Sequence, residues 1–374
     1  MPDPTPSQTE REANPILLVG HVVYFLLLLY LFFFSIELMS TAFRMGGRGF
    51  AEQLLNTASD PVAGLIIGFL ATSLLQSSST TTTIVVGLVA SDALTIQLAI
   101  PIIMGANIGT TVTNTLVCLS HITQNHEFRR AFAAATVHDL FNLFSVAILF
   151  PLEITTHFIE KSATYVASLI YGAEGVKFSS PVKVITKPVI NGFKEGLNHL
   201  TSSDTIIAWI LLGISVVLLF GCLVFLTKTL KSLMLDKLEL LFDRLIGKNA
   251  LIGMSLGVIM TVLVQSSSIT TSILVPMAGA GIITLRQIFS VTLGANVGTT
   301  ITALLATLGT TQLADAALTI ALCHLFFNIT GILLIYPIKK IRQIPINTAE
   351  RLGELAVKSK KLVILYIIGV FFLI

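Results

Sequence analysis

Long apolar stretches separated by short charged segments dominate this chain of 374 residues. A helix needs roughly 20 apolar residues to cross about 30 Å of hydrocarbon. Stretches of that length, free of Asp, Glu, Lys and Arg, occupy residues 13–36, 205–227 and 316–338, and residues 131–151 contain only two ionisable groups. Each predicts an ordinary membrane-spanning helix, so the fold class is expected to be an all-α polytopic membrane protein.

Two further apolar regions, residues 61–126 and 249–314, are interrupted by polar residues at membrane depth. Backbone breaks exposed to lipid would leave polar groups unpaired, at a cost of several kcal/mol each. We therefore expect broken helices and re-entrant hairpins that line a cavity. The interrupting residues are Gln76, Ser77, Ser78, Ser79 and Asn107 in the first region and Gln265, Ser266, Ser267, Ser268 and Asn296 in the second.

These two regions are copies of one another. Over residues 64–113, adding 189 to a residue number reaches a matching position without a gap, so that the two Gln-Ser-Ser-Ser runs align and the two Gly-Ala-Asn runs align. Beyond a shortened loop the offset becomes 186, which pairs His138 and Asn142 with His324 and Asn328. The chain is therefore predicted to contain two repeats, residues 14–151 and 205–338.

Loop charges predict the orientation of the repeats. The segment 339–374 is basic, which indicates a cytoplasmic segment followed by a partial C-terminal span, whereas the connecting loop 152–204 balances its charges and is expected to be extracytoplasmic. Residues 1–13 lack the basic start of a signal peptide and are expected to form a cytoplasmic tail before a retained first helix. Equivalent ends on opposite sides predict inverted-topology repeats, the architecture of secondary transporters.

Composition supports this class. Hydrophobic residues make up 54% of the chain and charged residues 11%, whereas an average soluble protein is about one quarter charged. A net charge of +3 on so few groups argues against nucleic acid as a partner. The three cysteines have no paired spacing, so neither a disulfide framework nor a zinc site is predicted.

The duplicated polar motif indicates a binding site. Serine and threonine clusters in membrane helices usually bond to their own backbone, but two matched copies, each with a later Gly-Ala-Asn-x-Gly-Thr-Thr run, favour a function. Amides at a half-helix N-terminus, hydroxyls and carboxamides suit an oxyanion, and their oxygens also ligate cations such as Na⁺. Because Arg286 is the only lysine or arginine in the apolar regions 61–126 and 249–314, co-bound cations would have to neutralise the anion.

The runs LLQSSSTTTT, IPIIMGANIGTTVTNT, EFRRAFAAATVHDLFN, LVQSSSITTS and LGANVGTTITALL are long and specific. Through them the chain, from about Leu28 to Pro337, resembles the type II sodium-dependent phosphate cotransporter family. The resemblance implies electrogenic, sodium-coupled import of inorganic phosphate, homodimeric assembly, and no cofactor besides the coupling sodium ions. It implies phosphate binding by Gln76, Ser77, Ser78, Ser79, Asn107, Thr110, Gln265, Ser266, Ser267, Ser268, Asn296 and Thr299.

The resemblance also implies sodium ligands, namely Asp139, Asn142, Thr299, Thr300, Gln76 and Gln265. In the family, an Asp in an HDxFN string accompanies electrogenic transport and a third sodium ion. Asp139 is the one acid in its helix, and Leu325 occupies the equivalent position in the second repeat. Because an isolated carboxylate in a membrane is costly, we expect it to face the polar interior and to have a cationic partner, or to pair with a nearby histidine.

The connecting loop departs from that of animal members because it has no cysteine and no Asn-x-Ser/Thr sequon. A multi-pass protein of the bacterial cell inner membrane, with a cytoplasmic N-terminus, is therefore expected.

Three other functions remain open on sequence. A sodium-coupled carrier of another small anion, such as sulfate or a carboxylate, would use the same donors, and so would a passive anion channel. An intramembrane hydrolase would need a serine activated by His138 or His324. Symmetric serine triplets argue against hydrolysis, because a catalytic nucleophile is usually single. The two histidines are instead expected to orient the broken helices.

Overall fold

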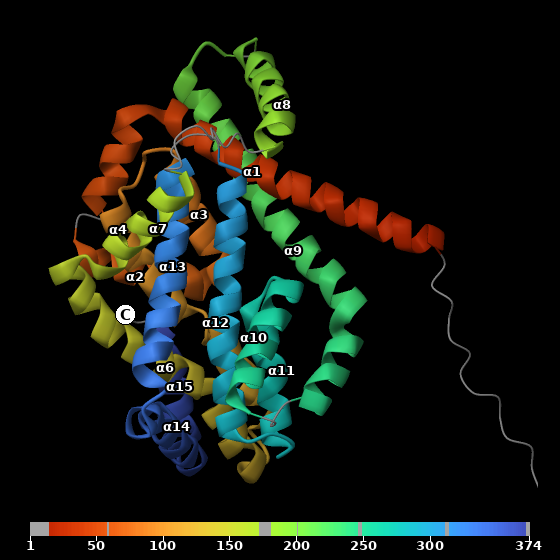
Figure 1. Cartoon of the computed structure of the whole chain (residues 1–374), viewed down its shortest axis with the longest axis vertical. Helices are drawn as coiled ribbons and strands as arrows, with labels where there is room; N and C mark the ends of the chain where they lie inside the picture. Colours follow the sequence, from red (N-terminus) through yellow and green to blue (C-terminus); the bar gives the residue numbers. More distant parts are fainter. Residues whose placement is uncertain are drawn as a thin grey trace, which may run out of the picture.

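The computed structural model of the chain describes residues 15–57, 60–171, 181–199, 201–245, 249–310 and 314–371 (Figure 1). Within these residues every regular element is a helix. In chain order the helices are α1 (Pro15–Thr57), α2 (Pro61–Leu75), α3 (Ser78–Ala90), α4 (Ile96–Gly109), α5 (Val112–Cys118), η1 (Leu119–His121), α6 (Asn125–Thr156), α7 (Phe158–Tyr171), α8 (Pro181–Asn198), α9 (Asp204–Leu245), α10 (Ala250–Val264), α11 (Ser267–Gly279), α12 (Leu285–Leu308), α13 (Ala314–Ile335), α14 (Lys339–Lys358) and α15 (Lys360–Phe371).

Six helical segments in the described ranges are long and apolar enough to cross a membrane. They are Val23–Phe43, Ile96–His121, Asn125–Thr156, Asp204–Phe225, Leu285–Leu308 and Asp315–Ile335. The prediction of an all-α polytopic membrane protein is thereby confirmed. Helices α2 and α10 are apolar but have only 15 residues each, a rise of about 22 Å that is too short for a full crossing. The predicted tail, residues 1–13, lies outside the described residues.

The two helices that flank each Gln-Ser-Ser-Ser run begin and end at equivalent residues in the two repeats. The bounds of α2 and α10 differ by 189 at both ends, and so do those of α3 and α11. A buried hydrogen bond joins Thr72 to Thr81 at 2.9 Å, and its counterpart joins Thr261 to Thr270 at 3.1 Å. The sequence repeat is therefore also a repeat of local structure.

Glycine sets how closely the helices of each repeat approach. A Cβ atom at Gly105 of α4 would lie 1.9 Å from the carbonyl oxygen of Leu65 in α2, and one at Gly294 of α12 would lie 1.9 Å from that of Met254 in α10. Only glycine permits such an approach. The glycines of both Gly-Ala-Asn runs therefore serve helix packing.

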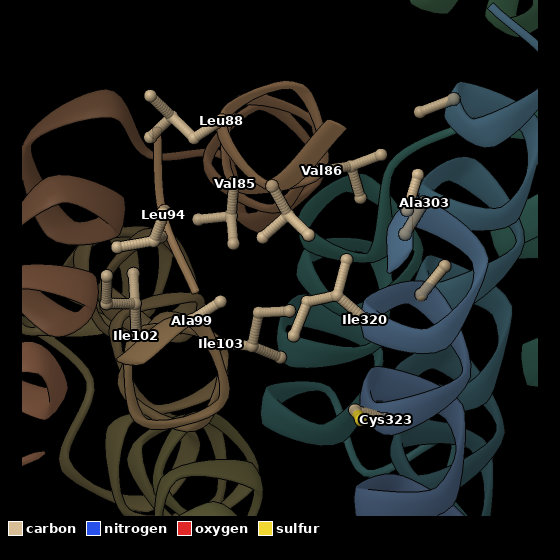
Figure 2. Packing of buried hydrophobic residues seen from close by; sticks show 14 of the residues in the cluster. Val85, Val86, Leu88, Leu94, Ala99, Ile102, Ile103, Ala303, Ile320 and Cys323 are labelled. Carbon is tan, nitrogen blue, oxygen red and sulfur yellow. The ribbon is translucent and has the colours of Figure 1, made fainter. Parts of the chain in front are cut away.

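An apolar core joins the two repeats. It is built from α3 and α4 of the first and α12 and α13 of the second. Figure 2 shows Val86 beside Ala303 and Ile103 beside Ile320, and all four side chains are buried. The packing is reciprocal, because α3 lies against α12 and α13 while its counterpart α11 lies against α5 and α6. Each of these equivalent helices thus packs against helices of the other repeat.

The segments outside the repeats are more helical than the sequence suggested. Residues 152–204, predicted as a connecting loop, contain α7 and α8, and α6 continues past Pro151 to Thr156. Helix α8 was missed because its apolar residues do not form a continuous run. It lies at one end of the molecule, and α14 lies at the opposite end (Figure 1).

Helix α14 packs against α6 through its small and apolar face. Ile346, Ala349, Gly353 and Ala356 are buried and follow helical spacing. This packing fixes the position from which the last helix, α15, starts.

We expect Gly294→Ala to destabilise the protein, because its Cβ atom would collide with the α10 backbone. Overpacking that forces the backbone to move typically costs about 1–3 kcal/mol. The measurement is the melting temperature of the purified protein in detergent. Gly213→Ala is the matched control, because nothing lies within 4 Å of its added atom. Equal melting temperatures for the two variants would contradict the proposed role of the close approach.

Candidate functional site

Each Gln-Ser-Ser-Ser run forms the same break between two helices. Gln76 ends α2 with a left-handed backbone, φ 51°, and Gln265 ends α10 with φ 55°. The next residues, Ser77 and Ser266, are extended and cap the following helices. The Ser77 hydroxyl accepts a hydrogen bond from the Thr80 amide at 3.2 Å. The left-handed glutamine stops one helix and the serine starts the next.

The two breaks converge on one pocket of about 390 Å³. Its polar lining comes from the ends of α2 and α10 and from the N-termini of α3 and α11, and α9 closes one wall with apolar side chains. The lining residues are Leu75, Gln76, Ser77, Ser79, Thr80, Phe220, Leu223, Val224, Gln265, Ser266 and Ile269. Two helix N-termini therefore meet at a single cavity.

This geometry favours an anion. The first amides of a helix lack helical acceptors and carry roughly half a positive charge, so a helix N-terminus attracts negative groups. Two N-termini and several hydroxyl donors face the same space, and no lining residue is charged. The charge of an anion bound here would not be balanced unless a cation bound with it.

The predicted phosphate ligands divide into two groups. Five of them line the pocket, namely Gln76, Ser77, Ser79, Gln265 and Ser266. The others lie outside its lining, namely Ser78, Ser267, Ser268, Asn107, Thr110, Asn296 and Thr299. The hydroxyls of Thr110 and Thr299 bond to the carbonyls of Ala106 and Ala295 within their own helices.

Three asparagines and a histidine link the repeats at the centre of the protein. Asn296 of α12 donates to the Asn142 side chain at 2.7 Å, and His138 Nε2 lies 2.6 Å from Asn296 Oδ1. Asn142 in turn donates to the Asn107 carbonyl at 2.7 Å. All four residues are buried. The predicted orienting role of His138 agrees with this contact, which ties α6 to α12.

The equivalent polar groups of the second repeat are not linked in this way. Both ring nitrogens of His324 and the Asn328 side-chain oxygen have no hydrogen-bond partner within the described part of the chain. A second difference concerns the glutamines. Gln265 accepts a hydrogen bond from the Thr302 hydroxyl at 3.0 Å, whereas Gln76 is exposed. Thr113 is the equivalent of Thr302, and its buried hydroxyl has no partner among the described residues.

The helices that carry these residues differ accordingly. In the second repeat α12 runs without interruption from Leu285 to Leu308, whereas in the first repeat the same stretch is divided into α4 and α5 around Thr110 and Thr111. The two repeats therefore share a sequence pattern but adopt different conformations.

The predicted sodium ligands do not form one cluster. Asn142 contacts Asn296 and Asn107, while the Thr300 hydroxyl bonds to the Val297 carbonyl at 2.7 Å. Asp139 is buried and accepts a hydrogen bond from the Tyr366 hydroxyl at 2.9 Å. The prediction of a cationic or histidine partner for Asp139 was wrong, because the hydrogen-bond donor to its carboxylate is the phenol of Tyr366 in α15.

Three polar residues in these contacts were missed by the sequence reasoning. Asn114 accepts hydrogen bonds from Thr271 at 2.9 Å and Ser272 at 3.2 Å, which joins α5 to α11. Thr302 holds Gln265, and Tyr366 holds Asp139. Asn114 aligns with an alanine in the second repeat, and Tyr366 lies outside both repeats, so the internal alignment gave no signal for them.

A group of possible metal ligands lies outside the pocket, at the junction of α6 and α7. Ligand atoms of Glu153, His157 and Glu160 lie within 4.8 Å of one another. The Glu153 carboxylate already accepts hydrogen bonds from the amides of Ile159 at 2.6 Å and Glu160 at 3.1 Å. This arrangement is a cap for the start of α7, which accounts for the buried acid without an ion.

Comparisons with known proteins agree with the motifs. A family model described as Na⁺/Pi-cotransporter matches residues 31–177 and 217–344. Relatives include sodium-dependent phosphate transport protein 2B of Homo sapiens and of Pongo abelii, each 35% identical over 95% of this chain. Protein 2A of Ovis aries is 36% identical over the whole of this chain and 69% of its own length.

The chain spans 64% of the length of the two 2B proteins. No solved structure matches it. Since the family model covers well over half of the residues, the chain belongs to the Na⁺/Pi-cotransporter family.

Proposed function

We propose that this protein is a sodium-coupled secondary active symporter that imports inorganic phosphate. The observation that carries the proposal is the single pocket formed by both Gln-Ser-Ser-Ser runs, which is lined by the N-terminal residues of two helices. The relatives named as sodium-dependent phosphate transport proteins supply the substrate and the coupling ion. Phosphate has the oxygens and the charge that this donor set suits.

Phosphate would bind between the two breaks. Ser77 and Ser266 each stand at a helix N-terminus, and Gln76 and Gln265 supply carboxamides on either side. Because the described lining contains no lysine or arginine, the phosphate charge must be balanced by cations that enter with it. Sodium ions taking carboxamide, hydroxyl and carboxylate oxygens would meet this need. Anion binding and sodium binding would therefore depend on each other, which is the basis of symport.

The difference between the repeats would provide the transport step. Transporters with inverted repeats alternate their access by moving one repeat against the other around a fixed site. The second repeat has a continuous α12 and a bonded Gln265, whereas the first has a divided helix and an exposed Gln76. We propose that the repeats exchange these two conformations as the pocket opens to opposite sides. His324 and Asn328 would then gain the contacts that His138 and Asn142 have here.

The setting follows from the same proposal. The protein would lie in the bacterial cell inner membrane as a homodimer, with its N-terminus and its basic segment 339–361 in the cytoplasm. Helices α8 and α14 lie at opposite ends of the molecule (Figure 1), which supports opposite sides of the membrane for the connecting segment 152–204 and the basic segment. The basic residues of 339–361 support the cytoplasmic side for α14.

The direct test is phosphate uptake by the purified protein in proteoliposomes. We expect uptake of radiolabelled phosphate to require an inward sodium gradient, and to be unaffected by excess sulfate or succinate. Competition by either anion would favour the alternative substrate. Uptake that persists in sodium-free buffer with an imposed pH gradient would contradict sodium coupling, and equilibration without any gradient would indicate a channel.

Asp139 is expected to make transport respond to membrane potential. Two sodium ions neutralise HPO₄²⁻, and a fixed carboxylate leaves room for one more, so that one net charge crosses in each cycle. Such a charge couples transport to voltage by about 2.3 kcal/mol per 100 mV. Asp139→Gly should retain part of the sodium-dependent uptake but lose its response to a potassium–valinomycin potential. A variant as voltage-sensitive as the parent would show that Asp139 is not responsible.

A further inference from the structure

Asp139 is buried, and only one of its two carboxylate oxygens accepts a hydrogen bond from the described residues. The side chain is 1% exposed, and the Tyr366 hydroxyl donates to its Oδ2 atom at 2.9 Å. Its Oδ1 atom has no hydrogen-bond partner in the described part of the chain. The ion pairs found in the same ranges involve other acids. The carboxylate is thus held by one neutral donor and keeps one open oxygen.

Tyr366 reaches this position from outside both repeats. It belongs to α15, which packs against α2 and α5 of the first repeat and follows α14. Its ring meets Phe132 of α6 edge to face, with ring centroids 5.8 Å apart. This contact and the surrounding apolar cluster, which includes Phe128 and Val363, fix the direction of the phenol. Phe132 and Asp139 lie seven residues apart on the same helix, so one face of α6 presents both to Tyr366.

The chemistry of the phenol distinguishes it from a cationic partner. A lysine or arginine at this place would neutralise Asp139 and compete with any ion for it. A hydroxyl donates one hydrogen bond and brings no formal charge. It therefore lowers the cost of burying the carboxylate and fixes its rotamer, while the negative charge and Oδ1 stay available to a cation.

We propose that Tyr366 is a positioning residue for a coupling sodium ion, holding Asp139 so that its open oxygen can ligate the ion. The inference rests on the proposed function, because it assigns the ion at Asp139 to sodium. It makes α15, a helix outside the repeats, part of the coupling machinery. Tyr366 itself need not touch the ion, since its effect passes through the carboxylate.

The test is sodium activation of phosphate uptake by Tyr366→Phe, which removes only the hydroxyl. A lost hydrogen bond to a charged group predicts that the half-saturating sodium concentration rises about tenfold or more. The maximal rate at saturating sodium and the half-saturating phosphate concentration should stay within about twofold of the parent, since the pocket is untouched. Tyr30→Phe is the control, because Tyr30 donates to the Ile185 carbonyl at an exposed site, and it should leave sodium activation unchanged.

A double-variant cycle separates positioning from a general structural effect. In an Asp139→Gly background, Tyr366→Phe should produce no further change in sodium activation, because its target is gone. An unchanged half-saturating sodium concentration in the single variant would overturn the proposal. So would an equal shift in both backgrounds, or a parallel loss of phosphate affinity.

Binding of radioactive sodium to the purified protein keeps this test independent of transport. If the parent shows no sodium-dependent phosphate uptake, the proposed function fails, but Tyr366→Phe must still weaken sodium binding by a similar factor for the positioning role to stand. Should Tyr366→Phe not fold, Phe132→Leu replaces it. That change keeps the hydroxyl and removes the ring that orients it, so sodium binding should weaken by about twofold or more, and unchanged binding would overturn the proposal.

Discussion

The structure depends on one constraint, which is that a helix interrupted inside an apolar environment must find partners for its freed backbone groups. Both repeats meet it in the same way. A left-handed glutamine ends one helix and a serine caps the next, and the first amides of α3 and α11 are left without helical acceptors. Bringing these two N-termini to one pocket concentrates the unpaired donors where a ligand can use them. The cost of the break and the ability to bind an anion therefore have a common origin.

The surrounding helices hold the breaks in place by two kinds of contact. Glycines such as Gly105 and Gly294 let α4 and α12 lie directly against the backbones of α2 and α10. Asn142 and Asn296 connect the repeats through a buried hydrogen bond. Glycine packing is found in both repeats, whereas the asparagine contact has no counterpart at Asn328, whose side-chain oxygen is unpartnered among the described residues. The close glycine packing is thus common to the two repeats, whereas the polar links differ.

The two helix breaks and the membrane-spanning class could be predicted from the sequence, because each polar motif occurs twice and the apolar runs are long. The equivalence of Gln76 and Gln265 predicted two matching breaks, and the structure has them at the same register. Apolar run length also predicted the membrane-spanning class. The roles of the Gly-Ala-Asn glycines could not be predicted, since close helix approach and ligand contact require the same residue.

Residues that act only through contacts between distant segments escaped the sequence analysis. Tyr366 lies 227 positions from Asp139, in a short apolar segment without a motif, and Asn114 has an alanine as its internal equivalent. Hydropathy also failed for α8, whose pattern is amphipathic. The division of the first repeat into α4 and α5 has no sequence signal either, because the Gly-Thr-Thr run at the break is present in both repeats.

The central claim is that both repeats contribute to a single phosphate site, and its most direct test is the stoichiometry of phosphate binding. Equilibrium binding of radiolabelled phosphate to the purified protein in saturating sodium should give one phosphate for each chain. Ser77→Ala and Ser266→Ala should each weaken that one site by about tenfold or more, the effect of losing a hydrogen bond to a charged group. Two phosphates for each chain, of which each substitution removes only one, would contradict the account.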